Sequence, residues 1–362
     1  MSCLSEPWPG GREFLRRLNA EAARRREPIS ASLELTRRCN LGCVHCYLPR
    51  RPDRSRAELS GAEVRSILDQ TAAAGCLSLL LTGGEPLLRD DFPELYRHAR
   101  ELGLIVVLFT NATRVDDRVI SALRANPPQE VEVTLLGATA ATHDALTGVP
   151  GSFEAGLEGV RRMLAAGLRV NLKTVLMEPN CHALGAMEAL ARELKVRFRF
   201  DPAVFPRLDR DPAPLAYRVA AETAIALDLA DPGRCERWRI QHDRPTATTH
   251  DRLYTCGAGT THFHVTAQGW LQPCSALDRP RFDLRCGTLA QGWARLAAVR
   301  EQRSPAHDVC QACEHRALCN ACPALNSLET GDPARPSEYL CALGTLRGQQ
   351  LRNLLLAERN IA

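Results

Sequence analysis

Between residues 30 and 201, short apolar runs alternate six times with longer segments whose apolar residues recur every three or four positions. Short runs rich in Leu, Val and Phe are typical of buried strands, and the longer period is that of an amphipathic helix. The pattern predicts strands over 32–35, 77–81, 104–109, 131–136, 169–177 and 196–200. It predicts helices, each followed by a glycine or a turn, over 60–74, 91–102, 116–125, 153–166 and 182–194.

Six β/α units in succession imply an α/β fold, in which helices cover a parallel sheet. The periodicity does not distinguish an open, doubly wound sheet from a full or partial barrel. In both architectures, ligands bind at the carboxyl ends of the strands, where the βα loops converge. We therefore expect the chemistry of this chain in the loops that follow the predicted strands.

Three cysteines lie within eight residues directly after the first predicted strand, in "TRRCNLGCVHCYLPR": Cys39, Cys43 and Cys46. Three thiols cannot all pair among themselves, and a disulfide would leave one reactive thiol. Thiolates suit an iron-sulfur centre, and three protein ligands on a four-iron cluster leave one iron open to a small molecule. A zinc loop or clustered core thiols are the alternatives.

Composition and charge narrow the class of protein. A chain of 362 residues with 45% hydrophobic residues buries a large core, so its 15 cysteines are not the staples of a small secreted scaffold. The N-terminus lacks the apolar region of a signal peptide, and no segment reaches the ~18 apolar residues of a membrane span. The 46 basic and 42 acidic residues are scattered. We expect a soluble cytoplasmic protein that partners neither a membrane nor nucleic acid.

The C-x3-C-x2-C spacing of Cys39, Cys43 and Cys46 resembles the signature of radical S-adenosylmethionine (SAM) enzymes, whose loop holds a [4Fe-4S] cluster by three thiolates. This resemblance implies that the three cysteines are the catalytic metal ligands. It also implies that the free iron binds the amino and carboxylate groups of SAM.

A second stretch, "LTGGEPLL" at 81–88, follows the second predicted strand and resembles the Gly-Gly-Glu motif of the same family. Gly83 and Gly84 carry no Cβ, so the backbone can approach a ligand closely. Glu85 could orient an ammonium group. Alone, a Gly-Gly pair after a strand is usually just a turn, but its spacing from the cysteines supports a cofactor site.

Further candidate SAM contacts lie at the end of the third predicted strand and on the fourth and fifth. Thr110 and Asn111 end the third strand, where a hydroxyl and an amide suit ribose. Glu132 and Thr134 share one face of the fourth strand, and Lys173 lies on the fifth. For each of these five residues, a satisfied polar side chain or a helix cap is the alternative interpretation.

Cysteines crowd the last third of the chain. The stretch "THFHVTAQGWLQPC" predicts a hairpin that turns at Gln268-Gly269, with thiols flanking it. The cysteine order of this region resembles the SPASM extension of one branch of radical SAM enzymes. The matching residues are Cys256, Cys274, Cys310, Cys313, Cys319, Cys322 and Cys341.

The SPASM resemblance implies two auxiliary iron-sulfur clusters with interleaved ligands. One set would be Cys310, Cys313, Cys319 and Cys341. The other would be Cys256, Cys274 and Cys322, with Cys286 as a fourth ligand or with one iron left open. Only two residues separate Cys319 from Cys322, where three are usual. Zinc knuckles are the alternative for 310–322.

The pattern and the resemblance together predict an α/β protein: a partial (β/α)6 TIM-like barrel with a C-terminal cysteine-rich SPASM domain that binds auxiliary iron-sulfur clusters. The expected parts are an N-terminal extension, the radical SAM barrel, a linker with a helix, the SPASM domain and a C-terminal helix, over 1–29, 30–201, 202–255, 256–345 and 346–362.

By resemblance, the chain is an enzyme that takes an electron from a flavodoxin- or ferredoxin-type reductant. It cleaves SAM to methionine and a 5′-deoxyadenosyl radical, which abstracts a substrate hydrogen. Relatives with this extension mature ribosomally made peptides, so the expected substrate is a peptide or small protein that is oxidised or crosslinked. Only ~30 residues precede the first strand, so we expect a separate chain to present any leader peptide. The alternatives are a tetrapyrrole or other small-molecule substrate, and a non-catalytic metal-binding scaffold.

Overall fold

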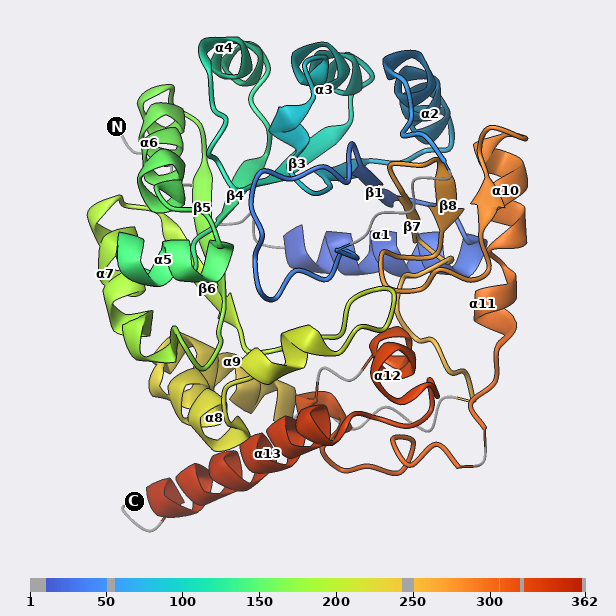
Figure 1. Cartoon of the computed structure of the whole chain (residues 1–362). Coiled ribbons are helices and arrows are strands. Elements are labelled where there is room, and N and C mark those ends of the chain that lie inside the picture. Colours follow the sequence, from blue (N-terminus) through green and yellow to red (C-terminus); the bar gives the residue numbers. More distant parts are fainter. Residues whose placement is uncertain (1–10, 51–55, 243–250, 306, 320–321, 360–362) are drawn as a thin grey trace.

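Residues 11–50, 56–242, 251–305, 307–319 and 322–359 are described by the computed structural model of the chain. Their strands form one curved sheet in the order β6-β5-β4-β3-β2-β1-β7-β8-β9 (Figure 1). The first six strands are parallel, each paired with the next in sequence. They are β1 (Ser30–Glu34), β2 (Ser78–Thr82), β3 (Ile105–Thr110), β4 (Glu130–Thr134), β5 (Val170–Val175) and β6 (Arg197–Asp201).

Helices connect these strands and ring the outside of the sheet (Figure 1). They are α2 (Gly61–Ala73), α3 (Phe92–Glu101), α4 (Asp117–Ala125), α5 (Ala140–Thr147), α6 (Ser152–Ala165) and α7 (Leu184–Glu193). A capping box begins α2, because the side chain of Ser60 accepts from the amide of Glu63 and the Glu63 carboxylate accepts from the amide of Ser60. The predicted partial barrel of six β/α units is confirmed.

The sheet continues beyond the barrel into the cysteine-rich region. β7 (His262–Val265) pairs in parallel with β1, and β8 (Trp270–Gln272) and β9 (Phe282–Asp283) follow in antiparallel order. The predicted hairpin is therefore present. Phe263 and Leu271 of this hairpin pack in the same hydrophobic core as Leu33 and Leu79 of the barrel. The sheet and the hydrophobic core are therefore continuous across residue 256, where the sequence predicted a boundary between two domains.

The remaining helices are α1 (Gly11–Arg25), α8 (Ala221–Ala230), α9 (Pro232–His242), α10 (Leu289–Arg295), α11 (Ala298–Glu301), α12 (Pro323–Thr330) and α13 (Glu338–Arg359). Of these helices, α8, α9, α12 and α13 lie in the lower part of the view in Figure 1, α1 crosses its middle, and α10 and α11 lie on its right. Among the described residues, no helix combines the length and the apolar character that crossing a membrane requires.

Several helices differ from the sequence interpretation. α1 lies in the expected N-terminal extension, and the expected linker holds two helices, α8 and α9, instead of one. α5 was not predicted, because its Ala and Thr residues give no strong apolar stripe; it begins at a Thr139 cap and ends at Gly148 in the left-handed conformation. α13 begins at Glu338 rather than at 346, so Cys341 lies on a helix.

Candidate active site

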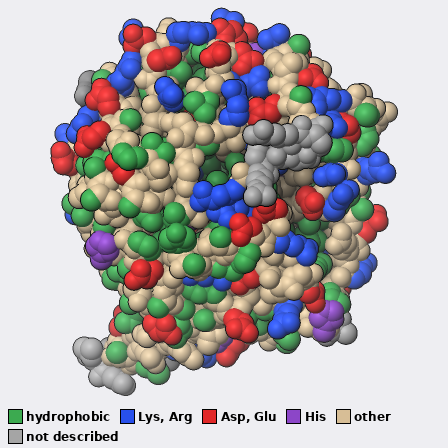
Figure 2. Space-filling view, viewed as in Figure 1, with side chains coloured by type: hydrophobic (Ala, Val, Ile, Leu, Met, Phe, Trp, Pro, Cys, Tyr) green, Lys and Arg blue, Asp and Glu red, His purple; other side chains and the backbone are tan. Residues whose placement is uncertain are grey.

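A cavity of about 530 Å³ opens at the carboxyl ends of the barrel strands. Predicted site residues that line it are Cys39, Cys43, Cys46, Gly83, Gly84, Thr110, Asn111, Thr134 and Lys173. The C-terminal region completes the wall with His264, Ser275, Ala276, Leu325 and Leu328. In the space-filling view, this face of the molecule is hollowed near its centre, where basic side chains gather (Figure 2).

The loop that carries Cys39, Cys43 and Cys46 (residues 36–50, the cysteine loop) is held in place by hydrogen bonds to two neighbouring parts of the chain. The amides of Gly42 and Val44 donate to the carbonyls of Thr147 and Leu146 at the end of α5, at 2.7 and 3.0 Å. Asn40 donates to the hydroxyl of Thr113 beyond β3, at 2.8 Å. The unpredicted helix α5 therefore supports the loop that carries the three thiols.

Burial dominates the electrostatics of the three thiols. Burial, followed by the charges of Cys46 and Cys39, raises the pKa of Cys43 to about 12. Burial is also the main cause of the raised pKa values of Cys39 and Cys46. Three such thiols become thiolates together only beside a strongly cationic centre, which deprotonates a coordinating thiol. The donor set therefore fits a metal cluster.

The two glycines of the Gly-Gly-Glu loop pack against the backbone of the cysteine loop. A Cβ on Gly83 would lie 2.3 Å from the carbonyl oxygen of Thr36, and one on Gly84 would lie 2.3 Å from that of Arg38. The Gly84 amide also donates to the Thr36 carbonyl at 2.7 Å. The absence of a Cβ on these glycines therefore lets the Gly-Gly-Glu loop pack closely on the cysteine loop. Both glycines also line the cavity, where the backbone can approach a ligand.

Glu85 is fully buried and does not line the cavity. Its carboxylate accepts hydrogen bonds from the Thr110 hydroxyl at 2.7 Å, the Asn111 amide at 2.7 Å and the Leu87 amide at 3.0 Å. Burial raises the pKa of Glu85 to about 7. In this structure Glu85 joins the end of β2 to the end of β3, instead of facing a ligand's ammonium group as the sequence suggested.

Lys173 is a largely buried cation that lines the cavity. Its Nζ lies 3.5 Å from Glu132 Oε2 and 2.9 Å from the centre of the Phe109 ring. Burial lowers the pKa of Lys173 to about 7. Glu132 does not line the cavity; it also accepts from Arg199 Nε at 3.1 Å. One carboxylate therefore orients two cations, Lys173 and Arg199, along the wall.

Comparison with known proteins identifies the family. The sequence model of the Radical SAM superfamily matches residues 33–180. The chain is 30% identical over 338 residues to the PqqA peptide cyclase of Xanthomonas euvesicatoria, covering 84% of this chain and 87% of that protein. The chain belongs to the radical SAM superfamily. It is also 29% identical over 338 residues to the AdoMet-dependent heme synthase of Methanosarcina barkeri, covering 86% of this chain and 96% of that protein.

Solved structures share the fold of this radical SAM enzyme. Streptococcus suis SuiB bound to its precursor peptide SuiA aligns with a TM-score of 0.68 at 16% identity, covering 94% of this chain and 83% of that chain. The enzyme anSMEcpe with bound AdoMet aligns with a TM-score of 0.67 at 16% identity, covering 92% and 100% of the two chains. At this identity the likeness concerns the fold, which is that of SPASM-type radical SAM enzymes.

Family membership establishes the enzyme class and its cofactors, a [4Fe-4S] cluster and SAM, so the alternative of a non-catalytic scaffold is not supported. The three thiols that line the cavity, Cys39 exposed and Cys43 and Cys46 partly buried, fit the cluster. His45 adds a buried Nδ1 that has no hydrogen-bond partner among the described residues, and His45 lines the same cavity. No three His, Cys, Asp or Glu side chains within the described ranges are placed to hold one metal ion.

Seven thiols of the C-terminal region act on one another in two groups. Burial comes first among the causes that raise the pKa of Cys310 to about 11, and the charges of Cys341, Cys319 and Cys313 contribute. Burial likewise raises the pKa of Cys274 to about 11, with contributions from Cys322 and Cys256. Cys319 thus acts on the first group and Cys322 on the second.

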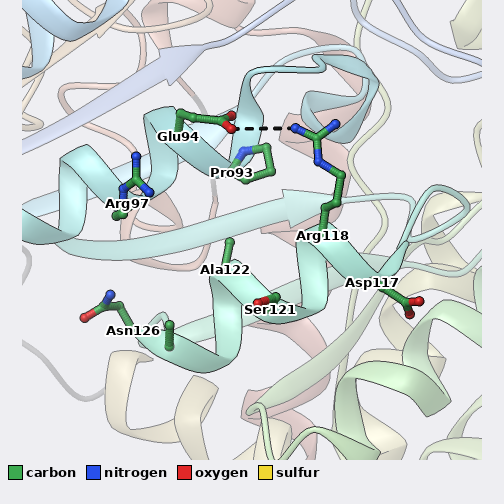
Figure 3. A pocket seen from close by; sticks show the side chains of 9 residues that line it. Pro93, Glu94, Arg97, Asp117, Arg118, Ser121, Ala122 and Asn126 are labelled. Atoms are coloured by element: carbon green, nitrogen blue, oxygen red, sulfur yellow. Dashed lines mark ion pairs between the residues drawn. The ribbon is translucent and has the colours of Figure 1, made fainter.

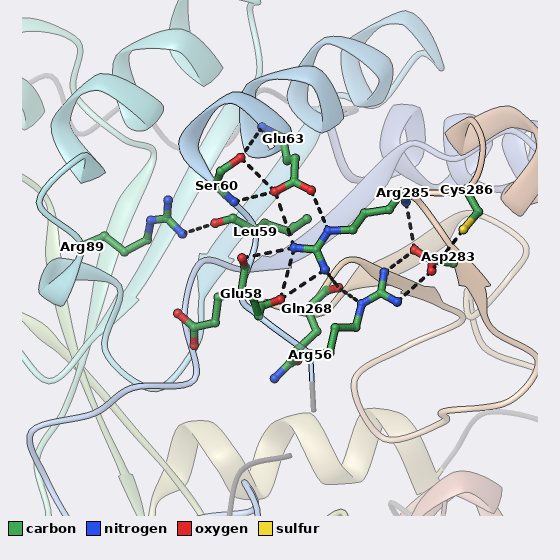
Figure 4. Close-up of polar contacts among 11 residues, drawn as sticks. Arg56, Glu58, Leu59, Ser60, Glu63, Arg89, Gln268, Asp283, Arg285 and Cys286 are labelled. Carbon is green, nitrogen blue, oxygen red and sulfur yellow. Dashed lines mark hydrogen bonds and ion pairs between the residues drawn. The ribbon is translucent and has the colours of Figure 1, made fainter. Parts of the chain in front are cut away.

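Cys286 lies with neither group. Its thiol is 3.5 Å from Asp283 Oδ2, and Asp283 is the main cause of its raised pKa. Asp283 pairs with Arg56, and Arg285 pairs with Glu63 at 2.6 Å, so these ions tie β9 to the segment before α2 (Figure 4). Cys286 is part of this ion network, which makes it a poor candidate for the fourth ligand of the Cys256 group.

A second hollow, of about 450 Å³, lies between α3 and α4 on the outside of the barrel (Figure 3). Its side chains include the ion pair between Arg118 and Glu94 at 3.6 Å. None of the cysteines in the described part of the chain lines it. The chemistry of the family therefore belongs to the cavity at the strand ends.

Several lining residues were missed from the sequence. Phe109, Arg199 and His264 face the cavity from β3, β6 and β7, and Leu325 and Leu328 face it from α12. Arg199 and Phe109 could have been found by asking which positions near strand ends share a face with the predicted contacts. The contribution of α12 depends on tertiary packing and has no local signal.

Proposed function

We propose that this radical SAM enzyme oxidatively modifies or crosslinks a ribosomally made peptide or a small protein. The observation that carries the proposal is the shared cavity. The barrel supplies the thiols and the candidate SAM contacts, and the C-terminal region supplies the opposite wall. A substrate group in this cavity would lie between the cofactor site and the Cys256 group, because Ser275 directly follows Cys274 in the chain.

The proposed roles follow from the contacts. Cys39, Cys43 and Cys46 hold the [4Fe-4S] cluster, which with SAM supplies the radical that removes a substrate hydrogen. Thr110 and Asn111 present polar groups to SAM at the end of β3. Burial of the site keeps water from a reactive species, which is what the protein contributes in cofactor chemistry.

Lys173, Glu132 and Thr134 would complete the SAM contacts. Lys173 and Thr134 line the cavity, whereas Glu132 acts from behind by orienting Lys173. Gly83, Gly84 and Glu85 act by joining the end of β2 to the cysteine loop and to β3.

A peptide substrate is supported by the similarity to a peptide cyclase over 84% of this chain. The lining is also mainly apolar, with Leu48, Phe205, Leu208, Leu325 and Leu328 around a few polar groups. Such a lining suits a hydrophobic or aromatic side chain that enters from a peptide. The reductant of flavodoxin or ferredoxin type and a separate leader-binding chain stay predictions.

A tetrapyrrole is the second candidate substrate. The similarity to a heme synthase over 86% of this chain favours it. Lys173 and Arg199 share a single carboxylate, Glu132, so the wall can accept a carboxylate group of a small molecule. The same charge also suits an acidic peptide residue, so substrate assays must separate the two.

We further propose that the two thiol groups of the C-terminal region hold auxiliary iron-sulfur clusters. The first set is Cys310, Cys313, Cys319 and Cys341. The second set is Cys256, Cys274 and Cys322, with one position for which the described residues offer no further cysteine. The mutual charge effects within each group support this division.

The substrate proposal is tested by offering two substrates to anaerobically reconstituted enzyme with reductant and SAM. One is a short peptide with hydrophobic and aromatic side chains, and the other is an iron coproporphyrin. We expect a mass change in the peptide that depends on SAM. A product from the porphyrin and none from the peptide would replace the proposal with the second candidate.

A further inference from the structure

Arg347 on α13 is a buried cation beside the proposed auxiliary cluster. Its side chain is only 3% exposed. The guanidinium donates to the carbonyl oxygen of Leu318, the residue before Cys319. It also stacks over Trp238, 3.9 Å from the ring centre. The chain therefore fixes this charge against the backbone that carries one of the four thiols.

One face of α13 is shaped to receive the segment that carries His315 and Cys319. A Cβ on Gly344 would lie 2.8 Å from Cys319 Cβ, and one on Gly348 would lie 2.5 Å from His315 Nδ1. The Cys319 thiol is 3.4 Å from the carbonyl oxygen of Leu340. Cys341, Gly344 and Gly348 recur at helical spacing, so the helix that carries a thiol also packs directly on Cys319.

The buried charges around Arg347 do not balance. Asp228 is fully buried and accepts from Arg347 Nη2 at 3.0 Å and Nε at 3.2 Å. Arg234 also pairs with Asp228. Two cations thus share one carboxylate, and Cys319 is a further group nearby whose ionised form would favour the charged state of Arg347. A buried excess positive charge is costly unless an anion lies nearby.

An iron-sulfur cluster with four thiolate ligands is such an anion, and it gains negative charge when it is reduced. A fixed cation at short range and low local dielectric stabilises the reduced form more than the oxidised form. The net charge around a cluster is one of the factors that set its potential.

We propose that Arg347 is a positioning residue whose buried charge raises the reduction potential of the cluster at Cys310, Cys313, Cys319 and Cys341, and that Asp228 limits this effect. The inference rests on the proposed auxiliary cluster. It assigns to α13 an electrostatic role in addition to supplying Cys341.

The test is a redox titration of the reconstituted full-length enzyme, followed by electron paramagnetic resonance. The signal of this cluster is identified by its loss in Cys319→Ser. Arg347→Gln removes the cation, so its midpoint should be more negative than that of the wild type. Asp228→Asn removes the opposing anion, so its midpoint should be more positive. Arg352→Gln is the control, since Arg352 lies on the same helix but is 46% exposed and screened by solvent.

Midpoint potentials that shift in opposite directions cannot arise from looser packing around the cluster alone, because looser packing would shift the midpoints of both variants in the same direction. Unchanged midpoints, or shifts of the same sign, would overturn the proposal. Arg347→Lys keeps the charge and should restore most of the wild-type midpoint; a lysine variant that matches the glutamine variant would also overturn it. If Arg347→Gln does not fold, Asp228→Asn alone decides by its sign. If Cys319→Ser removes neither iron nor signal, the cluster assignment itself fails, which iron analysis distinguishes from a failed charge effect.

Discussion

Gly84 lies so close to the cysteine loop that a Cβ on it would come within 2.3 Å of the carbonyl oxygen of Arg38 and within 2.7 Å of that of Arg37. The amide of the next residue, Glu85, donates to the same Arg38 carbonyl at 2.9 Å. The Gly-Gly-Glu loop and the cysteine loop are therefore one packed unit. A change in the first must displace the second.

Gly84→Val should lower the iron bound at Cys39, Cys43 and Cys46, because the branched side chain forces the cysteine loop away. Overpacking of this kind costs on the order of 1–3 kcal/mol. Iron analysis and calorimetry measure both effects. Gly185→Ala is the matched control, since a Cβ at Gly185 on α7 meets nothing within 4 Å. Full iron content with weakened SAM binding in Gly84→Val would show that the glycine serves the ligand alone.

Cys286→Ser should leave the iron content and the spectra of the enzyme unchanged, because the thiol contacts Asp283. Cys274→Ser should lose iron from the Cys256 group. Iron analysis of the two variants under anaerobic conditions makes the comparison. Loss of iron from the Cys286 variant would place this thiol on a cluster after all.

The free energy of unfolding should fall as the pH drops from about 6.5 toward 4, because buried His143 resists protonation in the folded protein. His143 on α5 accepts from the Leu136 amide at 3.1 Å, and burial lowers the pKa of His143 to about 4. The unfolded chain takes up a proton near pH 6.5, so the stabilisation is present above that pH and is lost as the pH falls toward 4. The loss is at most about 3 kcal/mol.

His143→Asn keeps an acceptor for the Leu136 amide but does not titrate. Its free energy of unfolding should fall less than that of the wild type between pH 7 and pH 4, as measured by denaturant titration. Other buried histidines with a lowered pKa, such as His262, are present in both proteins and contribute equally to the pH dependence of both curves. Parallel curves for the two proteins would contradict this role of His143.

Arg218→Met should destabilise the protein and loosen the cavity wall. Arg218 pairs with Glu329 of α12 through two contacts, at 2.6 and 2.9 Å, and both side chains are largely buried. Leaving a buried carboxylate unpaired costs on the order of 3 kcal/mol. The double variant Arg218→Met/Glu329→Leu should regain most of this loss in denaturant titrations. If the double variant loses as much free energy of unfolding as the two single variants lose together, Arg218 and Glu329 are not coupled.

The sequence predicted the barrel because six strongly patterned β/α units repeat the same periods, and parallel strands bring their loops together at one edge. Local spacing likewise identified the three thiols of the cysteine loop. The sequence did not reveal α5, whose Thr139 cap and Gly148 end are weak signals, or the pairing of β7 with β1, which joins residues more than 200 positions apart. Such contacts depend on tertiary packing rather than on local pattern.

The site shows the same division. Glu85 and Glu132 are where the strand pattern places them, but only the fold shows that both act from behind the wall. Cys286 is of a residue type that can bind iron, but its thiol lies against Asp283 in an ion network. Residue type and spacing identified the thiols, whereas the direction of a buried side chain depends on its partners.

The central claim is that Cys39, Cys43 and Cys46 hold the cluster at which SAM is cleaved. The most direct measurement is the yield of 5′-deoxyadenosine from SAM by anaerobic, reduced protein, comparing the wild type with the triple variant Cys39→Ala/Cys43→Ala/Cys46→Ala. We predict that the triple variant makes none and still holds the iron of the C-terminal thiol groups. Undiminished 5′-deoxyadenosine from the triple variant would contradict the account.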